Sequence, residues 1–518
     1  MLKARILLGL LFGLLICAAI SRAVNPWSPR PNWVSTDNEF TMSVAFADID
    51  NEDSYLELLA GNYNYPYSSF GSNPEELGLD EIGAQLVVYY DWDQENQCYN
   101  SSTDLTETPR CIDCIAVADY NNDSHMDIAM GLVVGKGKDG GVIVLENQAD
   151  TSPASMEDYF RDDVSGCYWK SDESYDCHVV RWVDFDCDGD LDLAALVVPS
   201  ILHIYVNVEP ISGVNMISND CAWVYYLGTD DSGTDDLEHS TTSPIEGTTM
   251  EFGDIDNDGD LDVFINAANQ ARVFENIDGD YPGDYYSLNP AVQNYREDAF
   301  CGSFAPDGDQ LVLAVGSFQF VDNPNDPMEE QRWGNDIYSF EDPYLVHQGR
   351  STVSGSFPAQ SVTDIQWAYL DEYDDRDLVA VSYPIYKENG PDDYIWDRGY
   401  EQIHLDPLTY TGDEFLTDIW TSSSGYSDLS TSLALGDIDG ESAYIEEVII
   451  DEATVSGNFP YLFHLDKFPF ISLEEVIVID ENQNWLCWGN DDFDVAYDPL
   501  NGWISIDNRF IPPINWCG

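Results

Sequence analysis

Short acidic loops are the part of the sequence best suited to chemistry. The cleanest reads Asp-Ile-Asp-Asn-Asp-Gly-Asp-Leu-Asp over residues 254–262, and similar loops cover residues 184–192 and 119–127. Calcium takes six to eight oxygen ligands, and acids at positions 1, 3 and 5 of a tight loop turn alternate side chains onto one centre. Glycine at position 6 of the first two loops permits the sharp bend. Since position 7 offers a backbone carbonyl and the acid at position 9 closes the shell, these loops predict calcium sites.

The predicted ligands are the side chains at positions 1, 3, 5 and 9. In the three strong loops they are Asp119, Asn121, Asp123 and Asp127; Asp184, Asp186, Asp188 and Asp192; and Asp254, Asp256, Asp258 and Asp262. Two looser loops would use Asp48, Asp50, Glu52 and Glu57, and Asp437, Asp439, Glu441 and Glu447, with Glu446 as an alternative to the last. We therefore expect about three strong calcium sites and up to five in all.

The loops could also be EF-hand calcium loops or acidic turns without a metal. An EF-hand opens in the same way but needs a glutamate at position 12 on a following helix. Position 12 here is Met130, Ala195 or Ile265, and apolar strand-like runs flank the loops, which excludes EF-hand and dockerin folds. An acidic, solvated turn is the remaining alternative, because Asp and Gly commonly form turns. Three similar copies disfavour it for the strong loops, and it stays open for the looser ones.

The acidic loops recur along the chain and so mark a structural repeat. They begin at residues 48, 119, 184, 254 and 437, and two copies that have lost most of their acids begin near residues 303 and 369. The spacing matches what one four-stranded propeller blade with its loops occupies.

The flanks of each loop indicate β-strands. Apolar runs such as residues 179–183 and 193–198 precede and follow the loop, as expected for a connection between two strands. A further strand ends in asparagine three times, at Asn147, Asn207 and Asn276, and helical periodicity is scarce. The sequence therefore predicts an all-β fold.

The segment from Phe252 to Asp262 closely resembles the FG-GAP/VCBS repeat, the unit of the integrin α-chain N-terminal β-propeller and of many secreted propellers. The resemblance spans roughly residues 40 to 490 and is most specific in the three strong loops. It implies a seven-bladed β-propeller with calcium-binding DxDxDGxxD loops on one face, formed as a single domain over residues 24–518. It also implies a role in cell adhesion.

The start of the chain indicates export. Lys3 and Arg5 precede an apolar run over residues 6–20 and the small-x-small pattern at residues 21–23, which together predict a signal peptide over residues 1–23. No later run approaches the ~20 apolar residues that a membrane-spanning helix needs. We expect a secreted or extracellular-surface protein with no transmembrane segment.

Cysteine usage fits an oxidising compartment. Of eleven cysteines, Cys17 lies in the predicted signal peptide, and the even number that remains favours disulfides in an exported chain. Their spacing suggests local bridges between Cys167 and Cys177 and between Cys487 and Cys517. A redox or zinc half-site at Cys111 and Cys114 is the alternative use of that pair.

The charge balance limits the partners. With 97 acidic and 19 basic residues, the formal net charge is −78, which disfavours nucleic acids and anionic membranes by repulsion. Hydrophobic residues still make up 44% of the chain, enough for a large core rather than a disordered acidic tail. We expect self-repulsion to be offset by bound cations or by salt.

No catalytic motif stands out. The chain has no G-x-S-x-G elbow, no H-E-x-x-H zinc helix and no phosphate-binding loop, and its seven histidines form no spaced pair. We therefore expect a monomeric binding or adhesion module for an extracellular protein or glycan ligand. Because some propellers of similar repeat type belong to polysaccharide lyases, a carbohydrate-active enzyme is the alternative, and whether the chain is an enzyme stays open.

Overall fold

The computed structural model describes part of the chain between residues 33 and 507. The described residues are 33, 35, 41–51, 55–62, 86–94, 96–105, 111–133, 140–148, 156, 159–160, 168–172, 174–186, 190–197, 201–208, 216–217, 223–226, 249–255, 261–267, 270–276, 285–288, 299–307, 310–317, 335–341, 344–351, 360–368, 377–384, 386–387, 394–395, 402–404, 414–415, 419–421, 432–435, 461–464, 477–479, 485–488, 494–498 and 503–507. Within these ranges the regular structure is β-strand, and none of them forms a helix long and apolar enough to cross a membrane. The all-β prediction is therefore confirmed. The predicted signal peptide lies outside the described residues.

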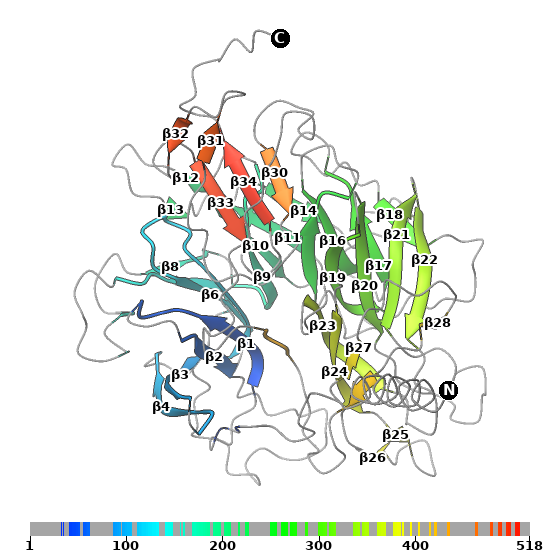
Figure 1. The fold of residues 1–518 in the computed structure, drawn as a ribbon, viewed down its shortest axis with the longest axis horizontal. Coiled ribbons are helices and arrows are strands. Elements are labelled where there is room, and N and C mark those ends of the chain that lie inside the picture. Colours follow the sequence, from blue (N-terminus) through cyan, green and yellow to red (C-terminus); the bar gives the residue numbers. More distant parts are fainter. Residues whose placement is uncertain are drawn as a thin grey trace, which may run out of the picture.

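Three antiparallel sheets of four strands follow one another from the N-terminal side (Figure 1). The first sheet comprises β1 (Thr41–Ala47), β2 (Glu57–Asn62), β3 (Leu86–Asp93) and β4 (Cys98–Asp104). The second comprises β5 (Ile112–Ala118), β6 (Asp127–Leu132), β7 (Gly141–Leu145) and β8 (Tyr168–Lys170). The third comprises β9 (Cys177–Val183), β10 (Asp192–Val197), β11 (Ile201–Tyr205) and β14 (Trp223–Tyr226).

The next three sheets keep the same antiparallel order. The fourth comprises β15 (Met250–Gly253), β16 (Asp262–Ala267), β17 (Gln270–Phe274) and β18 (Tyr285–Leu288). The fifth comprises β19 (Ala299–Asp307), β20 (Gln310–Ser317), β21 (Asn335–Glu341) and β22 (Tyr344–Ser351). The sixth comprises β23 (Gln360–Ala368), β24 (Asp377–Pro384), β27 (Gln402–His404) and β29 (Ile419–Thr421). Parallel pairing between β18 and β22 joins the outer edges of the fourth and fifth sheets.

Shorter strands complete the described structure. Three pairs or trios form outside the six sheets: β12 (Asn207–Val208) with β13 (Met216–Ile217), β25 (Tyr386–Lys387) with β26 (Tyr394–Ile395), and β30 (Tyr461–His464) with β34 (Trp503–Asp507) and β33 (Asp494–Asp498). A further pair is β31 (Ile477–Ile479) with β32 (Trp485–Trp488), and β28 (Glu414–Phe415) pairs with β22.

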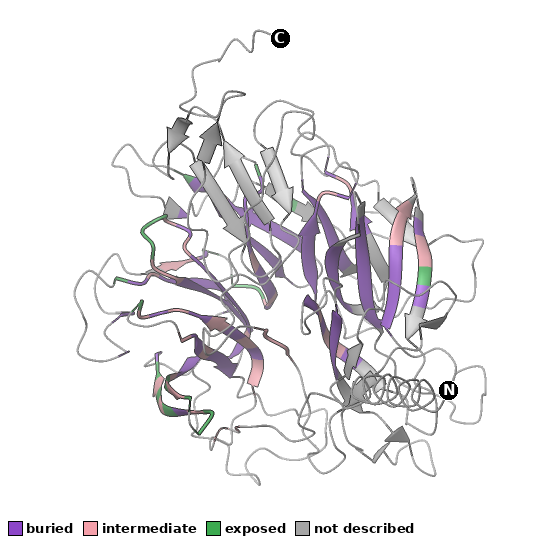
Figure 2. Ribbon diagram, viewed as in Figure 1, coloured by how far each residue is buried: buried purple, intermediate pink, exposed green. Residues whose placement is uncertain are grey.

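Consecutive sheets pack face to face around apolar clusters. β6 and β10 are buried at every position, which explains why their sequences are continuous apolar runs rather than alternating ones. Ile115 and Val117 of β5 pack toward Ala45 and Leu59 of the first sheet, whereas Ala116 faces the third sheet. Figure 2 shows that burial is concentrated in these packed strands. The core is therefore a series of layers between sheets, and the first strand of each sheet contacts the next from β1 through β5, β9, β15 and β19 to β23.

A β-bulge recurs near the start of the first strand in five of the six sheets. The register shifts leave Met42, Asp113, His178, Phe300 and Thr363 without a paired residue on the second strand. A bulge bends the strand and increases its local twist. Because it occurs at the same place in these sheets, it marks them as copies of one structural unit.

The segment 432–435 joins the far end of the chain to the first sheet. Val44 donates its backbone N–H to Ser432 Oγ over 3.4 Å, and Leu433 donates its own to Asp364 Oδ2 of β23 over 2.7 Å. Between the second and first sheets, Ile115 donates its backbone N–H to Ser43 Oγ over 3.1 Å. This bond is equivalent to the one between Val44 and Ser432. The segment therefore bonds to both β23 and β1.

The degenerate copy near residue 303 contains no ligand loop. β19 runs through Ser303 and Ala305 to Asp307, which pairs directly with Gln310 of β20. Only residues 308 and 309 separate these paired positions, too few for a loop with ligands at positions 1, 3, 5 and 9. Residues 369–376, the other degenerate copy, lie outside the described residues.

Candidate metal centre

The acidic loops join the first and second strands of their sheets. The loops that begin at residues 48, 119, 184 and 254 connect β1 to β2, β5 to β6, β9 to β10 and β15 to β16. In each loop, the last acid of the motif is the first residue of the second strand. Pairing with the first strand fixes the backbone of this residue and therefore where its side chain starts. These acids are Glu57, Asp127, Asp192 and Asp262. The sheets therefore place the loops at the same end of each unit.

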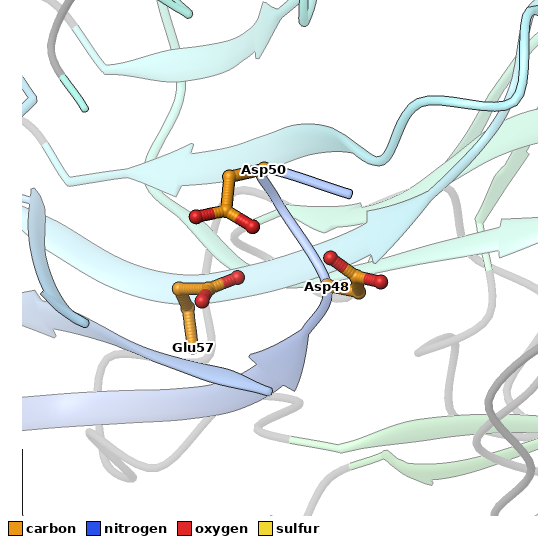
Figure 3. Close-up of side chains that lie close together, drawn as sticks. All are labelled: Asp48, Asp50 and Glu57. Atoms are coloured by element: carbon orange, nitrogen blue, oxygen red, sulfur yellow. The ribbon is translucent and has the colours of Figure 1, made fainter. Parts of the chain in front are cut away.

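The first candidate centre lies in the loop between β1 and β2. Asp48, Asp50 and Glu57 each offer a carboxylate oxygen within 4.8 Å of the other two (Figure 3). Glu57 is buried, and its Oε2 accepts a 2.7 Å hydrogen bond from the backbone N–H of Ile49. The two aspartates are only partly buried, so a cation could reach the group from solvent. Glu52, also a predicted ligand, lies outside the described residues.

The second candidate centre lies between β9 and β10. Asp184, Asp186 and Asp192 also bring carboxylate oxygens within 4.8 Å of one another. Asp192 is fully buried and accepts backbone N–H groups from Phe185 at 3.0 Å and Asn207 at 2.8 Å. Asp186 is exposed and opens the group to solvent. Asp188, predicted at position 5, lies outside the described residues.

The loop over residues 119–127 is described completely, yet its acids are not gathered in the same way. Within the described residues only the two groups above bring three acidic or other metal-binding side chains together. Asp119 accepts the backbone N–H groups of Asp123 at 2.9 Å and Ser124 at 2.8 Å, and Asp123 accepts that of His125 at 2.9 Å. Ser124 holds a φ of 69° where the other strong loops have glycine, a conformation that costs a side-chain-bearing residue energy. Asn121 also bonds within the loop, accepting from Asp123.

One buried oxygen of this loop has no hydrogen-bond partner in the described structure. This atom is Asp127 Oδ2, whereas Oδ1 accepts the Asn147 N–H at 2.7 Å. Burial is the main reason that the pKa of Asp127 is raised, and the charges of Asp123 and Asp119 raise it further. Burial likewise raises the pKa of Asp119 to about 6. A buried carboxylate oxygen without a partner is costly, and a bound cation would offset that cost.

The loop over residues 254–262 is described at its two ends. Asp254 is half-buried, and the buried Asp262 accepts backbone N–H groups from Ile255 at 2.9 Å and Asn276 at 2.8 Å. This arrangement repeats that of Asp192. Six other predicted ligands lie outside the described residues: Asp256, Asp258, Asp437, Asp439, Glu441 and Glu447.

A repeated asparagine connects the loops at residues 119 and 184 to the loop of the preceding sheet, a role that the sequence did not assign. Asn147 and Asn207 each donate a backbone N–H to the last acid of their own loop. Their side-chain amides reach into the preceding sheet, where Asn147 Nδ2 donates to Ile49 O at 2.8 Å and Asn207 Nδ2 to Tyr120 O at 2.9 Å. The sequence signal for this role was the asparagine that recurs just after the third strand, at positions 147, 207 and 276. These residues position the acids and tie consecutive loops together.

Comparisons with known proteins do not supply a family. No protein-family model matches the chain, and no curated protein matches it. Among solved structures, BBS1N in complex with ARL6DN is 11% identical with a TM-score of 0.30, over 55% of this chain and 65% of that chain. The V. cholerae biofilm matrix protein Bap1 is 13% identical with a TM-score of 0.31, over 75% of this chain and 54% of that chain. The chain thus matches less than two thirds of either structure.

The chain's own architecture defines its class. It is an all-β protein of repeated antiparallel sheets, in which two acidic loops gather carboxylates that could hold a metal ion.

Proposed function

We propose that this chain is a secreted, seven-bladed β-propeller of FG-GAP/VCBS type that binds calcium in its inter-strand loops and serves as a binding or adhesion module for an extracellular protein or glycan. The observation that carries the proposal is the repeated acidic loop at the same place in successive sheets. Two copies gather three carboxylates within 4.8 Å.

The ring is supported by contacts between units. The first strands of the six sheets contact one another in sequence, and segment 432–435 bonds to β23 on one side and β1 on the other. A seventh blade built on that segment would close a ring in which every sheet has two neighbours. Closure of this kind leaves only short, protected sheet edges.

Calcium is supported by the chemistry of the donors. Carboxylate and backbone carbonyl oxygens are the ligands that calcium prefers, and the loops supply several carboxylates in a chain of net charge −78. Asp48, Asp50 and Glu57 would hold one ion, and Asp184, Asp186 and Asp192 another. Bound calcium supplies positive charge that offsets the repulsion between these side chains. The partner-free Asp127 Oδ2 would contribute to a third site in the same way.

A structural role for calcium favours a binding module over an enzyme. Asp192 and Asp262, the last acids of two loops, each accept one backbone N–H from their own loop and one from the asparagine just after the third strand, so they hold elements of the fold rather than facing a substrate. In this arrangement calcium rigidifies one face of the ring. Rigid loops on such a face suit recognition of a ligand surface.

An array of glycans and extracellular proteins tests the function. We expect the purified chain to bind a defined set of ligands in calcium and to lose that binding in excess chelator. The double variant D184A/D186A should bind more weakly in calcium, whereas D307A, at the end of β19, should bind as the wild type does.

Two outcomes would contradict the function. Absence of any calcium-dependent binding across the array would contradict the binding module. Release of unsaturated products from acidic polysaccharides incubated with the chain would instead assign it to the lyases.

A further inference from the structure

Two buried cysteines meet where the second and third sheets pack together. Cys114 lies in β5 and Cys177 begins β9, and both belong to the apolar cluster between these sheets. A Cβ atom built on Gly131 of β6 would stand 2.3 Å from Cys114 Sγ and 3.0 Å from Cys177 Sγ. Since both sulfur atoms lie so near one point, they are close neighbours. Glycine at position 131 leaves the room that they occupy.

The strands that carry the two cysteines are held together at the same level. Asp113 and His178, the bulge residues next to the cysteines in sequence, form a hydrogen bond of 2.5 Å between Oδ2 and Nδ1. β5 and β9 also contact each other along their lengths. The two sulfur atoms therefore cannot separate without breaking a polar contact and opening the core between two sheets.

We propose that Cys114 and Cys177 form a disulfide that links the second and third sheets of the exported protein. The two thiols lose two protons and two electrons as the Sγ–Sγ bond forms. The electrons pass to a low-molecular-weight disulfide such as oxidised glutathione, which leaves as two thiols. This pairing across sheets competes with the local Cys167–Cys177 bridge expected from the sequence, because Cys177 can serve only one of them.

Other uses of the sulfur pair fit less well. Structural zinc needs four ligands, and within the described residues no third metal-binding side chain is grouped with these two sulfur atoms. The spacing of Cys111 and Cys114 suggested a redox or zinc half-site, but the sulfur next to Cys114 belongs to Cys177. The neighbouring sheet thus supplies a partner that the local spacing could not reveal.

Burial of the two cysteines determines whether the disulfide forms before or after the sheets pack. Cys114 and Cys177 are buried, and burial together with the neighbouring Cys114 raises the pKa of the Cys177 thiol. Because the thiolate is the nucleophile in disulfide exchange, the folded core suppresses the reaction. The bond therefore forms while the two sheets are still opening and closing, and it is shielded from reductants once they have packed.

Peptide mapping of the full-length secreted chain tests the proposal. The protein is denatured in iodoacetamide without reductant, digested and measured by mass spectrometry. We expect a peptide containing Cys114 joined to one containing Cys177, and we expect this species to disappear after reduction. The readout does not depend on calcium, so it separates this inference from the proposed function.

Two cysteine variants serve as test and control for the peptide mapping. C177A should leave Cys114 open to alkylation, whereas C301A should leave the cross-link intact, because Cys301 Sγ contacts Val362 O of the sixth sheet at 3.8 Å. Alkylation of both Cys114 and Cys177 in the unreduced wild type would overturn the proposal. A Cys167–Cys177 peptide would do the same. Since the wild type alone decides between these outcomes, poor folding of a variant leaves the test intact.

Discussion

Excess chelator at low salt should lower the unfolding temperature of this chain by about 10 °C or more, taking ~5 kcal/mol lost at about 2–4 °C per kcal/mol for a large domain. Extracellular calcium modules bind with dissociation constants of ~10⁻⁴–10⁻³ M. At roughly a hundredfold excess of calcium, each occupied site then adds about 2.7 kcal/mol to the folded state, and the two gathered carboxylate groups add about 5 kcal/mol. That is comparable with the ~5–15 kcal/mol stability of an ordinary domain.

Thermal unfolding in calcium, in chelator, and in chelator with sodium chloride separates two electrostatic effects. Salt should restore only the part of the stability that is lost to general repulsion in a chain of net charge −78, since screening cannot replace inner-shell coordination. Addition of calcium should restore all of it. An unfolding temperature that is the same in calcium and in chelator would mean that the loops are solvated turns.

The variant D192A should destabilise the chain both in calcium and in chelator, whereas D186A should destabilise it in calcium alone. Asp192 holds two backbone N–H groups, from Phe185 and Asn207, in a fully buried position. Leaving two buried donors unsatisfied costs about 1–3 kcal/mol each, independently of any metal. Asp186 is exposed, so a group that bonds to it can turn to water when it is replaced, and its loss removes mainly a metal ligand.

Repulsion among the acids does not reverse this expectation. In the calcium-free chain, replacing Asp192 also removes its repulsion with Asp184 and Asp186, so we expect a smaller loss of stability in chelator than in calcium. The loss should not vanish, because two buried N–H groups are left without their acceptor. Denaturant unfolding of both variants in calcium and in chelator measures the difference. If D192A matches the wild type in chelator, its carboxylate serves only as a metal ligand and the double role assigned to it is wrong.

Much of the local structure follows from the sequence. Apolar runs on both sides of the acidic motif predict strands, and the loops do connect first and second strands in four sheets. The last acid of each motif begins the second strand, so its burial follows from strand pairing. The loss of acids around Ser303 agrees with the strand register there. Asp307 pairs with Gln310, so only two residues lie between the paired positions. These features depend on residues close together in the chain.

The conformation of one loop and a contact between distant segments could not be predicted. The sequence ranked the loop at residue 119 above the one at residue 48, yet the latter gathers its carboxylates. In the former, Ser124 stands in a left-handed conformation and Asp119 bonds to the loop backbone instead. The bond between Val44 and Ser432 joins residues almost 400 positions apart, and no local pattern encodes it.

Anomalous diffraction from crystals grown in calcium would locate the bound ions themselves. We expect density for an ion about 2.3–2.6 Å from oxygens of Asp48, Asp50 and Glu57, and for a second ion among Asp184, Asp186 and Asp192. Crystals grown with chelator should lack both peaks. Anomalous maps from the calcium-grown crystals that are empty at both positions, with the carboxylates turned apart into solvent, would contradict a calcium-dependent fold.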